Sequence, residues 1–287
     1  MRFSNVNLRL LMPQRAVAVT ICAEPLGLVA GLADAAPMQE RVAHGDLELS
    51  FVYRGSLCYF VGGRFVEMGA GTLAVFWGAL PNQIVESEPD TELMYLRVPL
   101  GTLLRWGLNP TFVRKVLAGE LVADPQSPSW DADLTRRWLS DVGSQDSSTL
   151  RICELEVEAR LRRLSAKRLQ RTAPRLPEHK GRRQVEAITA FLSESYRDDI
   201  STADIGRAVA LHPNYAMTLF RRESGMSIWQ YLIRLRLSHA QLMLLTSDKT
   251  VLAIALESGF GSLARFYAAF TRECGTSPGE FRKRASL

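Results

Sequence analysis

The last hundred residues of this 287-residue chain contain an internal repeat, which restricts the fold more than any other feature. Six positions recur at an offset of 50, namely Phe220, Arg222, Glu223, Gly225, Ser227 and Tyr231, matched by Phe270, Arg272, Glu273, Gly275, Ser277 and Phe281. Upstream, Ile205, Ala210 and Leu211 match Ile254, Gly259 and Phe260 at an offset of 49. The offset therefore changes by one residue between the two sets, and an insertion of one residue is tolerated best in a tight turn. The repeat predicts two copies of one helix-turn-helix unit.

The first copy has the local signals of two short helices joined by a turn. Ser201 is a suitable N-cap for a helix ending near Ala210, with Asp204 at the spacing of a capping box. Leu211-His212-Pro213 supplies the turn, because proline suits the first position of the helix expected over Pro213–Glu223.

The second helix of this copy presents a polar face of the kind that enters the major groove of DNA. Its outward positions are Asn214, Met217, Thr218 and Arg221, with Arg222 beside them. Asparagine reads adenine edges, threonine and methionine contact thymine methyl groups, and arginine binds guanine or phosphate. A solvated amphipathic helix would show the same face, but the duplication favours DNA binding.

The second copy predicts helices over Val251–Ser258 and Ser262–Cys274. Two alanines on its outward face carry no hydrogen-bonding group, so Ser262, Arg265 and Tyr267 are expected on phosphates or on one or two bases.

Two further features bear on DNA binding, namely additional cations and the length of the helix between the two copies. Lys249 and Arg282 are additional phosphate candidates, although each could equally be an ordinary surface charge. A central helix expected over Ser227–Leu245 would be roughly 28 Å long. This approaches the ~34 Å that separates successive major-groove faces on one side of DNA, so both copies could serve one site.

The front half of the chain has the period-two pattern of antiparallel strands. Between residues 45 and 100 apolar and polar side chains alternate, and Gly62-Gly63 and Gly69-Ala-Gly71 mark two turns. Several short strands at this spacing predict an antiparallel barrel or sandwich. From about Ser129 the period becomes helical, with helices expected to about Val142 and then from Ser147 or Ser148 to about Arg171.

The second of these helices carries Leu150, Val157 and Leu164 at a spacing of seven, with Leu161 beside them. The stripe either packs on the chain's own barrel or forms a coiled-coil-like seam in a homodimer, and the heptad spacing favours the seam. The expected units are residues 1–128, the helical hairpin 129–171, a proline-containing linker 172–183, and the repeat domain 184–287.

Charge, cysteine and hydropathy set the cellular context. Residues 1–150 hold 12 basic and 16 acidic side chains, whereas residues 182–287 hold 14 and 10, so a polyanion is expected at the second half. Four cysteines without a CxxC pair favour a reducing cytoplasm. The apolar run Ala16–Ala23 imitates a signal peptide, but Glu24 and Pro25 interrupt it. We therefore expect a cytoplasmic protein that does not bind membranes.

The segments LHPNYAMTLFRRESGMSIWQYLIRLRLSHAQLML and GFGSLARFYAAFTRECGTSPGEFRKR resemble the AraC/XylS family of bacterial transcription regulators. The resemblance covers about residues 184–284. The positions that fit the family pattern are Phe220, Gly225, Leu232, Arg236, Ala255, Gly259, Phe260, Phe266, Phe270, Pro278 and Arg282. The resemblance implies sequence-specific binding to double-stranded DNA and activation of nearby promoters through RNA polymerase, commonly as a dimer.

The segment HGDLELSFVYRGSLCYFVGGRFVEMGAGTLAVFWGALPNQIVE is similar to the cupin-like effector domain of the family, nearest in pattern to the melibiose operon regulator group. The implied fold is α+β in two domains, with an N-terminal cupin-like antiparallel β-barrel and helical hairpin, then an all-α domain of two helix-turn-helix units. The implied effector is a small, sugar-like molecule. Val42 and Asn82 stand where metal-holding cupins have histidines, so no metal or other cofactor is expected.

An effector pocket would use polar and aromatic residues of the β-rich half. The candidates are His44, Glu48, Arg54, Tyr59, Trp77 and Gln83, although Trp77 could equally be core and Glu48 solvated. One rival is a metal-dependent cupin enzyme, but His44 is the lone histidine of this half and no GxSxG, Walker or HExxH motif occurs, so no catalytic residues are predicted. Another rival is a DNA-binding regulator whose front half only dimerises.

Overall fold

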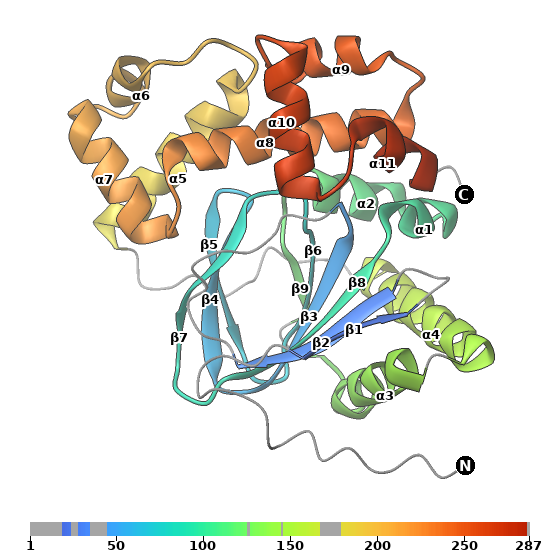
Figure 1. The fold of residues 1–287 in the computed structure, drawn as a ribbon. Coiled ribbons are helices and arrows are strands. Elements are labelled where there is room, and N and C mark those ends of the chain that lie inside the picture. Colours follow the sequence, from blue (N-terminus) through green and yellow to red (C-terminus); the bar gives the residue numbers. More distant parts are fainter. Residues whose placement is uncertain are drawn as a thin grey trace.

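The computed structural model describes residues 19–23, 28–34, 45–124, 127–144, 146–166 and 179–285. Its strands are β1 (Val19–Ala23), β2 (Leu28–Asp34), β3 (Leu47–Arg54), β4 (Ser56–Val61), β5 (Arg64–Gly69), β6 (Leu73–Trp77), β7 (Asn82–Ser87), β8 (Glu92–Val98) and β9 (Val122–Asp124). Its helices are α1 (Leu100–Arg105), α2 (Pro110–Leu117), α3 (Asp131–Ser144), α4 (Ser147–Ala166), α5 (Lys180–Ser195), α6 (Thr202–Ala208), α7 (Pro213–Ser224), α8 (Ile228–Thr246), α9 (Val251–Glu257), α10 (Leu263–Cys274) and α11 (Pro278–Ala285). Helices α5 to α11 gather at one end of the β-rich half (Figure 1).

The strands form two antiparallel sheets. One has the order β1-β2-β8-β3-β6-β9 and the other the order β5-β4-β7. An apolar cluster that includes Tyr59, Met68 and Phe76 fills the space between them. Neither sheet closes on itself in the described part of the chain, so the predicted antiparallel β domain is confirmed, whereas a closed cupin-like barrel is not.

The alternation along β3 places its two sets of side chains in different environments. Leu47, Leu49 and Phe51 join the core beneath the helices, whereas Val52 belongs to the cluster between the sheets. The Gly62-Gly63 turn predicted between β4 and β5 is present, with φ of 55° and 81°, values that favour glycine in a two-residue hairpin.

The other face of the six-stranded sheet is covered by α1 to α4. The predicted helical hairpin is present as α3 and α4, but the heptad stripe of Leu150, Val157, Leu161 and Leu164 is fully buried in this core. That stripe is therefore unavailable to a second copy of the chain, and the alternative in which the helix packs on its own domain holds. A heptad spacing serves a helix on a sheet as well as a coiled coil, so the sequence could not separate the two.

The repeat folds as two helix-turn-helix units, as predicted. Unit 1 comprises α6 and α7 together with the preceding helix α5 and its connection to α6, because α5 packs on both helices; unit 2 comprises α9 and α10, and α8 joins the two units. Ser201 and Asp204 form the predicted capping box. Helix α5 begins at Lys180 with His179 as its N-cap, so residues 180–183 belong to the helical domain, while residues 172–178 of the predicted linker lie outside the described residues.

Helix α8 carries apolar side chains toward three neighbouring cores. Leu232 lies in the core of unit 1, and Leu244 lies in the core of unit 2. A third set, Leu235, Leu242 and Leu245, packs against a core built from the β-rich half and its helices.

The β-rich half meets the helical half where α8 and the β4–β5 hairpin lie together, and we call this contact the domain seam. Its residues are Phe60, Phe65, Tyr231, Leu235, Leu242 and Leu245. The Phe60 ring lies 6.0 Å from the ring of Phe220 and 5.9 Å from that of Tyr231, between centroids. The Thr189 hydroxyl donates to the Gly63 carbonyl at 2.9 Å. The seam therefore joins the β-rich half to both unit 1 and α8.

Candidate nucleic-acid interface

Helix α7 presents the face that the sequence predicts. Asn214, Thr218 and Arg221 are exposed and Met217 is half-buried, while the opposite side packs into the core of unit 1. The Thr218 hydroxyl donates to the Asn214 carbonyl at 2.9 Å. Because the hydroxyl proton is already used, Thr218 offers a base only its acceptor oxygen and its methyl group, and the methyl group suits apolar contact with a thymine.

Helix α10 presents a plainer face. Ala264, Tyr267, Ala268 and Thr271 are exposed, with Tyr267 39% exposed. Leu263, the first residue of the helix, is 37% exposed.

Ser262 caps this helix, since its hydroxyl accepts a hydrogen bond from the Arg265 amide at 3.3 Å. Its first role is therefore structural, and Arg265 remains the exposed cation beside the α10 face.

The side chains of the other predicted phosphate contacts bind partners within the chain. Arg222 donates to Glu223 Oε1 from Nε and Nη2 at 2.9 and 2.7 Å, and Lys249 Nζ lies 2.6 Å from Glu257 Oε2. Exposed ion pairs of this kind are weak, so both cations can exchange partners for a phosphate. Arg282 differs, because it donates to the carbonyls of Leu244 and Lys249 and so ties α11 to the end of α8.

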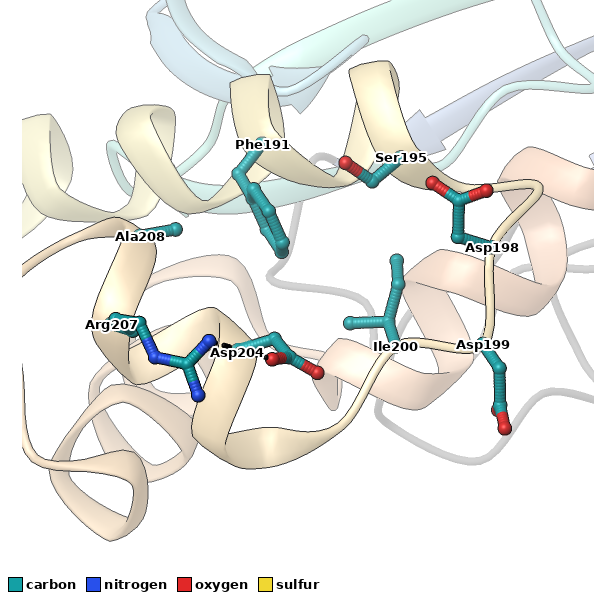
Figure 2. A pocket seen from close by; sticks show the side chains of 8 residues that line it. All are labelled: Phe191, Ser195, Asp198, Asp199, Ile200, Asp204, Arg207 and Ala208. Carbon is teal, nitrogen blue, oxygen red and sulfur yellow. Dashed lines mark hydrogen bonds and ion pairs between the residues drawn. The ribbon is translucent and has the colours of Figure 1, made fainter.

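Unit 1 also contains a pocket of about 370 Å³ between the end of α5 and helix α6 (Figure 2). Its lining residues are Phe191, Ser195, Asp198, Asp199, Ile200, Asp204, Arg207 and Ala208. Arg207 pairs with Asp204, which leaves Asp198 and Asp199 as uncompensated carboxylates of the lining, so the pocket itself does not attract a phosphate.

Of the predicted effector residues, the structure brings Glu48 and Tyr59 together. Both are fully buried, and Ser50 lies between them, 3.4 Å from Glu48 Oε1 and 3.4 Å from the Tyr59 hydroxyl. Arg97 Nε lies 3.7 Å from Glu48 Oε2 and is buried without a hydrogen-bond partner of its own. Ser50 and Arg97 were not predicted from the sequence, although Arg97 pairs with Glu48 in the β3–β8 register.

The remaining effector candidates lie elsewhere. Arg54 donates to the Asp90 carbonyl, and Trp77 belongs to the core beneath the helices, with its indole N–H donating to the Gly45 carbonyl at 3.0 Å. Gln83 lies against Gly225 at the end of α7. His44 is outside the described residues. The predicted set of six is therefore not one site.

The residues that the structure describes lack two other features. No group of three histidine, cysteine, aspartate or glutamate side chains there could hold a metal ion. Within the same residues, no helix has the length and apolar character to cross a membrane.

Comparisons with known proteins agree with the geometry. The family described as "Helix-turn-helix domain" matches residues 205–284. The chain is 25% identical over 248 residues to the melibiose operon regulatory protein of Escherichia coli (strain K12), covering 84% of this chain and 82% of that protein. It is 36% identical over 101 residues to the HTH-type transcriptional activator RhaR of Yersinia pseudotuberculosis, covering 35% of each.

Among solved structures, the DNA-binding domain of AdpA in complex with a target DNA is 27% identical, with a TM-score of 0.32, and the match covers 33% of this chain and 86% of that one. The resemblance that the repeat carries is confirmed: residues 205–284 match a helix-turn-helix family, and the similar curated proteins are AraC-type transcription regulators.

Proposed function

We propose that the chain is a sequence-specific regulator that reads one DNA site with both helix-turn-helix units and responds to a small polyhydroxylated effector. The observation that carries the first part is the pair of exposed faces on α7 and α10, joined by one continuous helix. On this proposal Asn214, Met217, Thr218 and Arg221 read bases, whereas Arg222, Lys249, Arg265 and Tyr267 mainly hold phosphates. Arg282 contributes by anchoring α11.

The effector part rests on the cluster of Glu48, Ser50, Tyr59 and Arg97 between the sheets. A buried carboxylate, two hydroxyls and a guanidinium supply acceptors and donors for the hydroxyl groups of a sugar. The melibiose operon regulatory protein is similar over 84% of this chain, which supports a sugar as the effector class.

The domain seam supports a route from effector to DNA. Because α8 contacts both the β-rich half and the two units, a ligand that favours one arrangement of the β-rich half would shift how the units are presented. On this route the effector changes DNA binding without touching the DNA.

The output that we propose is activation by a homodimer in the cytoplasm, with RNA polymerase as the partner. Similarity to a transcriptional activator supports this output. For the dimer, the outer face of α4 replaces the buried heptad stripe, since Ile152 and Leu155 there are 56% and 48% exposed. An antiparallel pair of α4 helices would place Ile152 of one copy near Leu155 of the other, which gives the self-complementary contact that a two-fold interface requires.

The experiment uses the full chain and two probes. A randomised duplex library tests DNA reading, and the affinity of the enriched duplex is expected to fall linearly with salt on logarithmic scales, with a slope of about −0.9 per phosphate contact. Failure to enrich any sequence would refute the reading of bases.

The second probe is a panel of sugars, with α-galactosides included, tested by thermal unfolding. A binding sugar should raise the Tm of the wild type, and Glu48→Gln should remove that shift while the exposed Glu88→Gln keeps it. If no sugar shifts the Tm, the front half only dimerises or binds another class of ligand.

A further inference from the structure

Unit 1 and unit 2 lie against each other beside α8, where the α5–α6 connection contacts the turn of unit 2. Arg236 of α8 donates from Nε to the Tyr196 carbonyl at 2.6 Å and from Nη2 to the Asp198 carbonyl at 2.8 Å. Both acceptors belong to unit 1's side of α8, so Arg236 fixes that connection to the central helix. Charged donors make the stronger class of hydrogen bond.

Gly259, in the turn of unit 2, closes the same point from the other side. A Cβ at this position would lie 2.8 Å from the Tyr196 carbonyl oxygen, 2.9 Å from Arg197 Cα and 3.0 Å from Arg236 Nε. Two of these three atoms belong to backbone, which cannot move aside as the end of a flexible side chain does. The residue also has φ of 84°, so glycine is required both for its conformation and for the close approach.

His239 extends this contact by one turn of α8. Its Nδ1 lies 3.4 Å from the Ser258 hydroxyl of unit 2, and its Nε2 lies 3.5 Å from Arg197 Nη2 of unit 1. The Tyr196 ring packs edge-on at 5.5 Å between centroids. One histidine therefore touches both units.

We propose that Arg236, His239 and Gly259 form a joint that sets the separation between the two DNA sequence blocks that the chain accepts. The proposal rests on the proposed DNA reading by α7 and α10. One inserted base pair moves the second block by about 3.4 Å along the DNA and turns it by about 35° around the axis. With the joint closed, α10 cannot follow that movement by swinging about the end of α8.

The joint makes Arg236 and Gly259 positioning residues for specificity, although neither lies on a face that reads bases. Loss of the joint relaxes the spacing requirement and leaves the sequence of each block unchanged. A merely structural role would lower stability or overall affinity without altering the preferred spacing.

The test is selection from a randomised duplex library by the full-length wild type and by each variant, read as the distribution of spacings between the two enriched blocks. The wild type should enrich a single spacing, discriminating against one added base pair by about a hundredfold, and Arg236→Met should reduce that discrimination by about tenfold. Arg236→Lys, which keeps a charged donor, should fall between the two. Gly259→Ala should shift or broaden the distribution.

The chain offers two matched controls for Gly259→Ala. A Cβ at Gly261, two residues further along the same turn, meets nothing within 4 Å, so Gly261→Ala should keep the wild-type spacing. Gly275 has φ of 69° but open space around it, so Gly275→Ala adds the backbone strain without the contact and should also keep it.

The proposed joint is refuted if Arg236→Met and Gly259→Ala both enrich the same single spacing as the wild type. It is also refuted if the wild type enriches only one sequence block. Enrichment of no sequence by the wild type would instead refute the proposed DNA reading itself. Thermal unfolding of each variant shows whether it is folded, and Arg236→Lys keeps the comparison informative if Arg236→Met is not.

Discussion

Replacing Phe60 by alanine is expected to loosen the domain seam while leaving both halves of the chain folded. Phe60 is fully buried, and its ring has three aromatic neighbours, of which Phe65 is in the same hairpin and Phe220 and Tyr231 are across the seam. A buried phenylalanine-to-alanine change costs about 3–5 kcal/mol. Assigning two-thirds of this cost to the contacts across the seam gives about 2–3 kcal/mol, or a shift of about 30- to 150-fold toward undocked halves.

Amide hydrogen exchange measures this shift directly. Phe60→Ala should accelerate exchange along α5 and the β4–β5 hairpin, which face each other across the seam, by about that factor if opening of the seam limits exchange there. Phe76→Ala is the matched control, because Phe76 is equally buried but lies between the two sheets. It should destabilise the β domain and leave α5 unchanged. The reasoning is refuted if Phe60→Ala leaves α5 protected, or if Phe76→Ala exposes α5 equally.

Three further predictions concern DNA reading, assembly and pH. Thr218→Ala should change the selected DNA sequence at one position, and a uniform loss of affinity instead would contradict the assignment of the α7 face. Lys249→Ala should weaken binding to all duplexes alike and reduce the slope of log affinity against log salt concentration by about one. Ile152→Glu should convert a dimer to a monomer in analytical ultracentrifugation, and a variant that stays dimeric would place the interface elsewhere. Burial, assisted by the charge of Arg197, lowers the pKa of His239 below its ordinary 6.5. The unfolded chain therefore binds the proton more readily than the folded chain, and the free energy of unfolding decreases as the pH falls below about 6.5. In urea unfolding, His239→Gln should reduce that loss, and an unchanged pH profile would show that His239 does not contribute.

The sequence predicted the helical half well because its signals are local. The N-cap at Ser201, Pro213 at the start of α7 and Gly225 at its end each act within one turn of helix, and the duplication repeats the evidence. The strands of the β-rich half were also predictable, since alternation is a local property. Closure of the sheets depends on long-range pairing, so the pattern could suggest a barrel but could not establish one.

The sites were predicted less completely, because they depend on which distant residues meet. Glu48 and Tyr59 were found as polar and aromatic candidates, but Trp77 has the same composition signal and lies on the other side of its sheet. Gly259 was recognised from the repeat, yet its contact with the Tyr196 carbonyl belongs to the tertiary structure. A sequence pattern shows that a glycine is needed, and only the fold shows what approaches it.

The arrangement of α8 implies that effector response and operator spacing are coupled. Leu235 of the domain seam and Arg236 of the joint are adjacent residues on one helix, so a movement of α8 at the seam displaces the joint as well. Phe60→Ala, which acts only at the seam, should therefore also broaden the spacing distribution in the duplex selection, by less than Arg236→Met does. Should the spacing remain sharp while the effector response is lost, the seam and the joint would be independent, and α8 would transmit the signal without bending or rotating between its two contacts.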